Sequence, residues 1–215
     1  MQTGPGERRP TAPAIRVTTV GAACHGVAMH VETPRLVIRP WTHDEAVRLL
    51  DIQSRLEVVT WLGDGEPVLM KDLEEAHERI DRYHRRSEHP PLGFWAVEVR
   101  ETPGEPGRVV GSVLLLTLPN DDHGEVEIGW HLHPDSWGRG YATEAAAAVM
   151  QHGFDGGLTE IYALTHTDNE PSKAVCRRLG MEDLGVMEKY YEGESCLFRM
   201  TPQRWSATAG RAATD

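Results

Sequence analysis

Apolar positions in the middle of the chain follow two different periods, and these periods predict an ordered series of strands and helices. Runs rich in β-branched and aromatic residues predict strands over 35–41, 92–100, 108–118, 124–133, 159–167, 182–192 and 194–201. Apolar residues three and four apart predict helices over 43–53, 71–88, 141–154 and 171–180. The order βααβββαβαββ predicts an α/β fold with a mixed sheet of about seven strands and about four helices.

The apolar positions of the first two predicted helices indicate which side of each is buried. In the strongly charged helix over 71–88, the predicted buried stripe consists of Leu73, Ala76, Ile80 and Tyr83. In the helix over 43–53, Val47 and Leu50 lie at helical spacing with other apolar residues nearby.

The two ends of the chain differ in composition from its middle. Residues 1–29 are rich in Gly, Pro, Thr and Ala, and residues 206–215 are mostly Ala, Ser, Thr and Gly. Segments of this kind bury little apolar surface, so both are expected to be flexible tails. A single ordered domain is therefore predicted over 30–205.

Charge and cysteine content limit the expected partners. Lys and Arg number 22 against 33 Asp and Glu, which gives a formal net charge of −11. Nonspecific nucleic-acid binding needs a basic footprint, so nucleic acid is not an expected partner, whereas amines suit an acidic protein. No apolar run is long enough to predict a membrane span. Cys24, Cys176 and Cys196 form no CxxC pair, which predicts reduced thiols in a cytoplasmic protein, and no metal cofactor is expected.

A glycine-rich turn separates a predicted strand from the alanine-rich helix over 141–154. Gly138 and Gly140 flank Arg139 just before the helix begins. A helix N-terminus offers unpaired backbone N–H groups and a positive dipole end, and glycines let a bulky anion approach them. Neither the Walker nor the Rossmann spacing is present. The turn therefore indicates either a phosphate or pyrophosphate site, with Arg139 at its rim, or a plain connection.

The sequence around this turn resembles a known family. The run EVEIGWHLHPDSWGRGYATEA, followed by YALTHTDNEPSKAVCRRLGM, closely resembles the GNAT superfamily of N-acetyltransferases. Within it the match is to the RimJ/RimL-like branch, which acetylates protein N-termini or small amines. The resemblance covers about residues 30–205 and implies a GNAT-type mixed sheet, splayed at two parallel strands, with acetyl-CoA as co-substrate.

The resemblance also implies where acetyl-CoA binds. The pyrophosphate would lie on the backbone amides of the glycine turn, which comprises Trp137, Gly138, Arg139, Gly140, Tyr141, Ala142 and Thr143. Trp137 stands where the superfamily usually has Gln or Arg, so one polar contact is missing. Asn169 looks like a helix N-cap and, in the family, the matching Asn also contacts the CoA arm.

The pantetheine arm would lie between the strands over 124–133 and 159–167, which the helix over 141–154 connects as a parallel pair. Gly129 lies in the middle of the first strand, where glycine often marks a bulge. A bulge there would free an N–H at Gly129 or Trp130 to stabilise the oxyanion of the tetrahedral intermediate.

Glu127 is the first choice for the general base that takes the proton from the amine. Glu125 and Glu127 lie two apart on one strand and so face the same side, with Glu127 nearer to the glycine. The competing interpretation is that both are solvated strand carboxylates. His131 and His133 are further candidates, because histidine titrates near neutrality.

The leaving thiolate of CoA would benefit from a proton donor. Many members of the family use a tyrosine early in the following helix, but this sequence has Ser172 there instead. Ser172 is either that donor or a first-turn residue that bonds backbone groups. Cys176 is interpreted as a buried thiol and not a nucleophile, because the family transfers the acetyl group directly.

The acceptor is the least determined part of the prediction. Trp61, Tyr83 and Phe94 are candidates to line its pocket, although such aromatic residues are more often core. Tyr190 and Tyr191 would close the other wall. The acceptor is a primary amine, either a protein N-terminal α-amino group or a small molecule such as an antibiotic or polyamine. A non-catalytic acyl-CoA-binding regulatory module is the alternative from another class, and a homodimer is one option for assembly.

Overall fold

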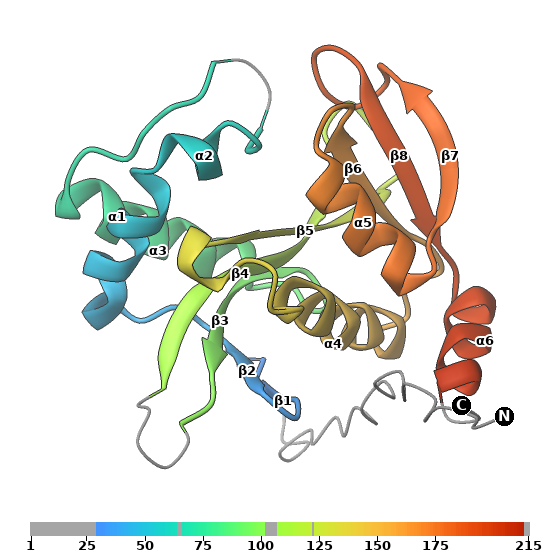
Figure 1. Cartoon of the computed structure of the whole chain (residues 1–215), viewed down its shortest axis with the longest axis horizontal. Coiled ribbons are helices and arrows are strands. Elements are labelled where there is room, and N and C mark those ends of the chain that lie inside the picture. The colour runs from blue at the N-terminus through green and yellow to red at the C-terminus, as the bar shows by residue number, and fades with distance from the viewer. Residues whose placement is uncertain (1–28, 64–65, 102–106, 122, 213–215) are drawn as a thin grey trace, which may run out of the picture.

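The structure is a computed structural model that describes residues 29–63, 66–101, 107–121 and 123–212. The flexible tail predicted over 1–29 therefore lies, except for Met29, outside the described residues. Within the described residues, no helix is both long enough and apolar enough to cross a membrane. Figure 1 shows a central sheet with helices on both of its faces.

Eight strands form one mixed sheet, in the spatial order β1-β2-β3-β4-β5-β6-β8-β7. The strands are β1 (Val31–Glu32), β2 (Leu36–Arg39), β3 (Gly93–Val99), β4 (Arg108–Thr117), β5 (Val126–Leu132), β6 (Ile161–His166), β7 (Glu182–Met187) and β8 (Ser195–Met200). All neighbours are antiparallel except β5 and β6, which are parallel. The predicted mixed sheet is confirmed, with the two-residue β1 as an additional strand.

The helices include all four that were predicted and some that were not. They are η1 (His43–Glu45, a 3-10 turn), α1 (Ala46–Gln53), α2 (Leu56–Val59), α3 (Leu73–Arg86), η2 (Pro134–Ser136, also 3-10), α4 (Tyr141–Asp155), α5 (Glu170–Leu179) and α6 (Pro202–Ala212). η1 and α1 together span the helix predicted over 43–53, whereas η2 and α2 are too short to be predicted from periodicity.

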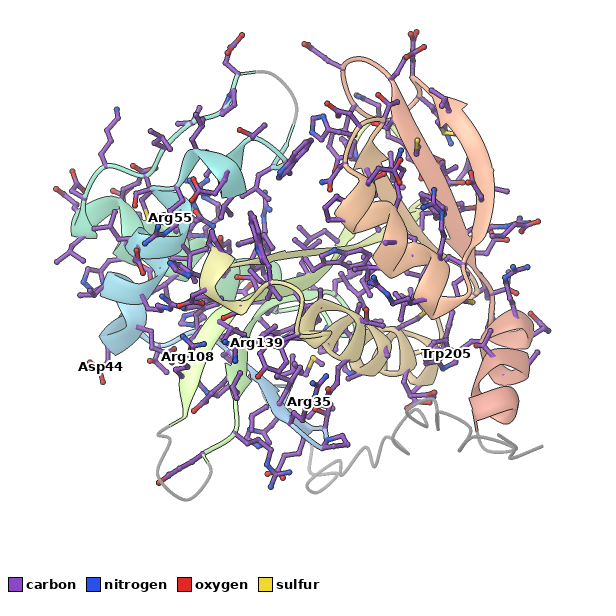
Figure 2. All side chains as sticks on the ribbon, in the orientation of Figure 1. Arg35, Asp44, Arg55, Arg108, Arg139 and Trp205 are labelled. Atoms are coloured by element: carbon purple, nitrogen blue, oxygen red, sulfur yellow. The ribbon has the colours of Figure 1, made fainter. Side chains whose placement is uncertain are left out.

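The flexible tail predicted over 206–215 is corrected up to Ala212, because α6 continues through Ala212, and residues 213–215 lie outside the described residues. Trp205 is half-buried against the main core, and its indole Nε1 donates a hydrogen bond to Gln151 Oε1 at 2.7 Å. Arg204 Nε also donates to the carbonyl oxygen of Gly180. Trp205, labelled in Figure 2, and Arg204 therefore connect α6 to the rest of the domain.

Two apolar clusters fill the two faces of the sheet. One packs α4 and α5 against one face, and the other packs α1 and α3 against the opposite face. Ala76, Ile80 and Tyr83 are buried as predicted, but Leu73 at the start of α3 is 44% exposed. Val47 is 66% exposed, because α1 turns Ala46, Leu49 and Ile52 toward the sheet instead.

Candidate active site

The sheet opens between β5 and β6, and this opening defines the candidate site. The two parallel strands pair only at Glu127 and Tyr162, after which they diverge. Helix α4 connects them as the crossover. A cleft of about 970 Å³ lies at the divergence and is lined by residues from β5, the start of α4, β6, the start of α5 and the segment around α2. The predicted splay between two parallel strands is therefore confirmed.

The bulge predicted at Gly129 is not present on the β4 side. The register between β4 and β5 runs without a shift from Gly111↔Leu132 to Thr117↔Val126, passing through Leu114↔Gly129. A Cβ added at Gly129 would lie 3.1 Å from a Leu114 methyl carbon, which is a tight contact that Leu114 would have to relieve. Glycine therefore suits the close packing against β4, and the opening has another origin.

Divergence from β6 is what leaves a backbone donor of β5 facing the cleft. His133 N donates to the carbonyl of Val110 at 2.8 Å, and hydrogen-bonded positions alternate along an antiparallel pair. Odd-numbered residues such as Gly129 therefore turn their backbone groups to β4, whereas Trp130 turns its N–H toward β6. Since β6 has already diverged at that level, the Trp130 N–H faces the opening.

The glycine turn is built from η2 and the first residues of α4. Gly138 and Gly140 have φ values of +73° and +79°, a region that favours glycine, and Gly140 is the N-cap of α4. A Cβ at Gly138 would meet no other heavy atom within 4 Å, so the space beside it is open. The backbone donors at the start of α4 are therefore accessible from the cleft.

Arg35 supports the turn from outside the cleft, and it was not predicted. Its Nε donates to Glu144 at 2.7 Å, its Nη1 donates to the carbonyl of Arg139 at 2.9 Å, and its guanidinium lies 5.0 Å from the Tyr141 ring centroid. Figure 2 labels Arg35 and Arg139. Arg35 lies more than a hundred positions earlier in the chain than the turn, so no local pattern indicates the contact.

All but one of the residues predicted for the site line this one cleft. They are Glu127, Gly129, Trp130, Trp137, Gly138, Gly140, Tyr141, Ala142, Thr143, Asn169 and Ser172. Arg139 is the exception, because it does not line the cleft. Eleven of the twelve predicted residues therefore lie along one cleft, and the roles given to them stay predictions.

Two side chains next to the helix starts lie at the cleft. Thr143 lines it, and its Oγ1 is a buried atom with no hydrogen-bond partner among the described residues, which is unusual for a hydroxyl. Asn169 is the N-cap of α5, and its Oδ1 accepts from the Ser172 N–H at 3.1 Å. Ser172 thus occupies the first turn of α5 with its residue facing the cleft, which is compatible with either predicted role.

Glu127 differs from its neighbour Glu125 in surroundings. Tyr191 donates its hydroxyl hydrogen to Glu127 Oε1 at 2.5 Å. Burial raises the pKa of Glu127 above its ordinary value, opposed by the Tyr191 hydrogen bond and by the positive charge of Arg86. Glu125 instead accepts from Lys189 Nζ at 2.7 Å and does not line the cleft. The two carboxylates, which were predicted together, therefore have different hydrogen-bond partners, and only that of Glu127 belongs to a residue that lines the cleft.

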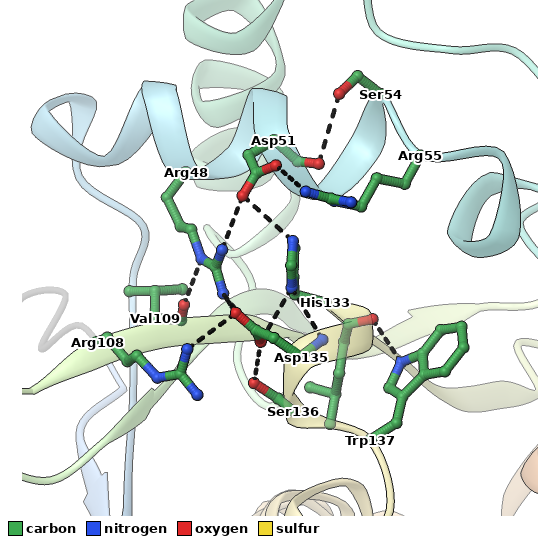
Figure 3. A network of polar contacts seen from close by, with 11 residues as sticks. Arg48, Asp51, Ser54, Arg55, Arg108, Val109, His133, Asp135, Ser136 and Trp137 are labelled. Atoms are coloured by element: carbon green, nitrogen blue, oxygen red, sulfur yellow. Dashed lines mark hydrogen bonds and ion pairs between the residues drawn. The ribbon is translucent and has the colours of Figure 1, made fainter.

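The two histidines proposed as alternative bases also have different surroundings. His131 lines the cleft and is buried beside Gln53, and burial, together with the positive charge of Arg79, lowers its pKa to about 4. His133 does not line the cleft. Its Nε2 lies 3.2 Å from an Asp51 carboxylate oxygen and its Nδ1 lies 2.9 Å from Asp135, so it connects α1 to η2 (Figure 3).

The aromatic residues considered for the acceptor pocket divide between cleft and core. Tyr83 and Phe94 are wrong as pocket residues, because they stack in the core with ring centroids 3.7 Å apart. Trp61, after α2, lines the cleft and contacts His166, at the end of β6, edge-on at 5.8 Å. Tyr191 also lines the cleft. Aromatic side chains from two segments far apart in the sequence therefore line the cleft.

The cysteines with described positions support no covalent chemistry. Cys176 is fully buried, and this burial raises the pKa of its thiol to about 12. A thiol that stays protonated is a poor nucleophile. Cys196 lies on β8 and does not line the cleft. The interpretation of Cys176 as an inert buried thiol agrees with this geometry.

Comparison with known proteins assigns the family. A model of the acetyltransferase (GNAT) domain matches residues 35–182, which is well over half of the chain. The chain therefore belongs to the GNAT family of acetyltransferases. It is an N-acetyltransferase, and acetyl-CoA is the acetyl donor that this family uses.

Three similar proteins illustrate the match. The uncharacterized N-acetyltransferase YoaA of Bacillus subtilis is 29% identical over 161 residues, which cover 74% of this chain and 86% of YoaA. RimJ of Mycobacterium smegmatis, solved with CoA-disulfide, superposes with a TM-score of 0.67 at 20% identity, over 83% of this chain and 88% of its own. The ribosomal-protein-S5-alanine acetyltransferase of Vibrio fischeri gives a TM-score of 0.64 at 17% identity, over 82% and 98%. The two structures are similar to this chain in fold.

Proposed function

We propose that the protein transfers the acetyl group of acetyl-CoA directly to a primary amine, with Glu127 as the general base. The observation that carries the proposal is the position of Glu127. Its carboxylate lines the cleft beside the point where β5 and β6 diverge, and burial raises its pKa toward the range useful for proton transfer near neutrality.

Acetyl-CoA would lie with its pantetheine arm between the diverging strands and its pyrophosphate on the turn from Trp137 to Thr143. The two left-handed glycines and the N-terminus of α4 supply backbone donors for that anion. The buried Thr143 hydroxyl, which has no protein partner, is a further donor to it. The exposed Trp137 indole is fixed by its Nε1, which donates to the carbonyl of Leu132 at 2.8 Å.

In the reaction, the neutral amine nitrogen attacks the thioester carbonyl carbon, forming the C–N bond. The Trp130 N–H is proposed to stabilise the resulting oxyanion. Glu127 takes one proton from the nitrogen, directly or through a water, and the C–S bond then breaks. The departing sulfur gains a proton, and Ser172, in the first turn of α5, is proposed as its donor.

The charge of the cleft favours a cationic acceptor. Four carboxylates, from Glu57, Glu127, Glu192 and Glu194, line it, and Arg178 is the one Lys or Arg among the described residues that do. An ammonium group would be attracted to such walls and would face the Trp61 ring. A protein N-terminal α-amino group is the first choice. The sequence resembles the branch that acetylates such groups or small amines, and the structural neighbours include RimJ and a ribosomal-protein-S5-alanine acetyltransferase. A small polyamine-like amine is the second, since the same carboxylates suit it.

Turnover against pH for wild type, Glu127→Gln and Glu125→Gln tests the base. One peptide with a free α-amino group and one small diamine serve as acceptors. Glu127→Gln should lower turnover about 10²–10⁴-fold near neutrality and leave acetyl-CoA affinity nearly unchanged. The loss should be smaller for the peptide, whose α-amine has a pKa of about 8, than for an amine with a pKa of about 10.4.

Glu125→Gln is the matched control, because that carboxylate lies two residues away but outside the cleft. Equal turnover for Glu127→Gln and wild type would reject Glu127 as the base. A raised Michaelis constant with unchanged turnover would instead show that Glu127 only attracts the acceptor.

A further inference from the structure

A cluster of imidazole and carboxylate groups lies on the surface where η1 meets α3, away from the cleft. His77, Asp81 and His84 are spaced four and three residues apart on α3, so they share one face of that helix. His43 reaches them from η1, with its Nε2 3.1 Å from Asp81 Oδ1. None of the four residues lines the cleft.

The geometry of three of these groups suits a metal ion. One ligand atom each from His43, Asp81 and His84 can be chosen so that all three lie within 4.8 Å of one another. All three side chains are exposed, so an ion could enter from solvent without any rearrangement of the fold. Three protein ligands leave at least one coordination position to water, as in many zinc sites.

The outer contacts determine which ring nitrogen of each histidine is free for an ion. His84 Nε2 lies 2.7 Å from the carbonyl oxygen of Trp41, which can only accept, so Nε2 carries the hydrogen and Nδ1 carries the lone pair. His43 Nδ1 lies 2.9 Å from His77 Nδ1. If His43 binds an ion through Nε2, its Nδ1–H donates to His77. A histidine ligand commonly donates its other ring N–H to a fixed acceptor in this way.

We propose that His43, Asp81 and His84 form a binding site for a divalent transition-metal ion such as Zn²⁺, with His77 and the Trp41 carbonyl orienting the two rings. The ligand set of two imidazoles and one carboxylate selects this class over Mg²⁺ or Ca²⁺, which prefer oxygen ligands. The ion would connect η1 to α3, and none of its ligands lines the cleft. The site is thus separate from the acetyl-transfer reaction, for which no metal is expected.

Without an ion, the same atoms can form an ordinary hydrogen-bonded network. His43 Nε2–H would donate to Asp81, and His77 Nδ1–H would donate to His43 Nδ1. The two descriptions differ in the tautomer of His43 and in whether removing one imidazole changes metal affinity. That difference makes the proposal testable.

The test is calorimetric titration of Zn²⁺ into the full chain after treatment with a chelator. Wild type should bind one ion at this site, and His43→Ala and His84→Ala should each weaken it tenfold or more. His77→Ala should weaken it by a smaller factor, because His77 orients a ligand and does not bind the ion. His89→Ala is the matched control, since His89 is exposed, lies shortly after α3 in the sequence and is not part of the cluster.

Two further measurements keep the result decisive. Saturating Zn²⁺ should raise the melting temperature of wild type but not of His84→Ala, because an ion that binds only the native state stabilises it. Co²⁺ in place of Zn²⁺ should give no sulfur-to-metal charge-transfer absorption, which separates this site from any cysteine site. No saturable binding up to millimolar Zn²⁺, equal affinity in His84→Ala and wild type, or a thiolate absorption band would each overturn the proposal.

Discussion

The two sides of β5 show how one strand serves both stability and chemistry. On its β4 side the strand is paired along its whole length with no register shift. Apolar side chains of both strands are buried in the main core. On its β6 side it is paired at a single position, and a cleft replaces the missing partner. The paired side fixes where the backbone of β5 lies, and the open side leaves Glu127 and the Trp130 N–H available to a ligand. The following substitutions should affect one side without the other.

The largest effect is expected on the paired side, from Leu115→Ala. Leu115 is fully buried and pairs with Ile128 across β4 and β5. Removing a buried leucine side chain typically costs about 2–5 kcal/mol in the free energy of unfolding. Urea unfolding should show this loss, while turnover per folded molecule at 25 °C should stay within about twofold of wild type. A large fall in turnover without a loss of stability would contradict the division between the two sides.

The second prediction concerns the pH dependence of stability, through His131. Burial holds the pKa of His131 at about 4, below the ordinary value of 6.5, so the unfolded chain binds a proton more readily than the native one. The resulting loss in the free energy of unfolding is absent above pH 6.5 and grows as the pH falls from 6.5 toward 4. It should reach about 2 kcal/mol at pH 5.

The measurement is urea unfolding of wild type and His131→Gln at pH 7.5 and pH 5. The variant should lose less stability than wild type between these two pH values, whatever its stability at pH 7.5. Parallel pH dependence in the two proteins would show that other groups account for acid sensitivity.

The third prediction addresses the open side, at Thr143. Its buried hydroxyl has no protein partner, so Thr143→Val removes an unsatisfied polar atom with little change in shape. The free energy of unfolding should stay unchanged or rise slightly, whereas CoA affinity should fall about tenfold if the hydroxyl donates to the phosphate. Calorimetry with CoA and thermal unfolding of the same samples check both halves. Unchanged affinity would remove this hydroxyl from the binding site.

The smallest effect is expected from Tyr191→Phe, which changes the partner of Glu127 and not the base itself. The Tyr191 hydrogen bond lowers the pKa of Glu127, so its removal should raise that pKa further. A base must be deprotonated to act, and the acid limb of the turnover profile should therefore move to higher pH. Turnover well above that limb should match wild type. A shift in the opposite direction would assign the limb to another group.

The sequence by itself determined the order of elements and the position of the cleft. Gly138, Gly140 and the alanine-rich helix after them are local signals, because left-handed backbone and helix propensity depend on a few adjacent residues. Asn169 at the start of α5 is another local signal, and the structure has it as the N-cap. These features could be predicted because their causes lie within a few positions of one another.

Other features depended on contacts between distant segments and were decided only by the tertiary structure. Arg35 reaches the Arg139 carbonyl from β2, and Trp205 holds α6 in a segment whose composition predicts a tail. The Trp130 N–H faces the cleft because β6 diverges there, and not because of a bulge at Gly129. Glu125 and Glu127 look equivalent in the sequence, but Tyr191 and burial distinguish Glu127. Packing brings these partners together after the local elements have formed, so a sequence pattern does not contain them.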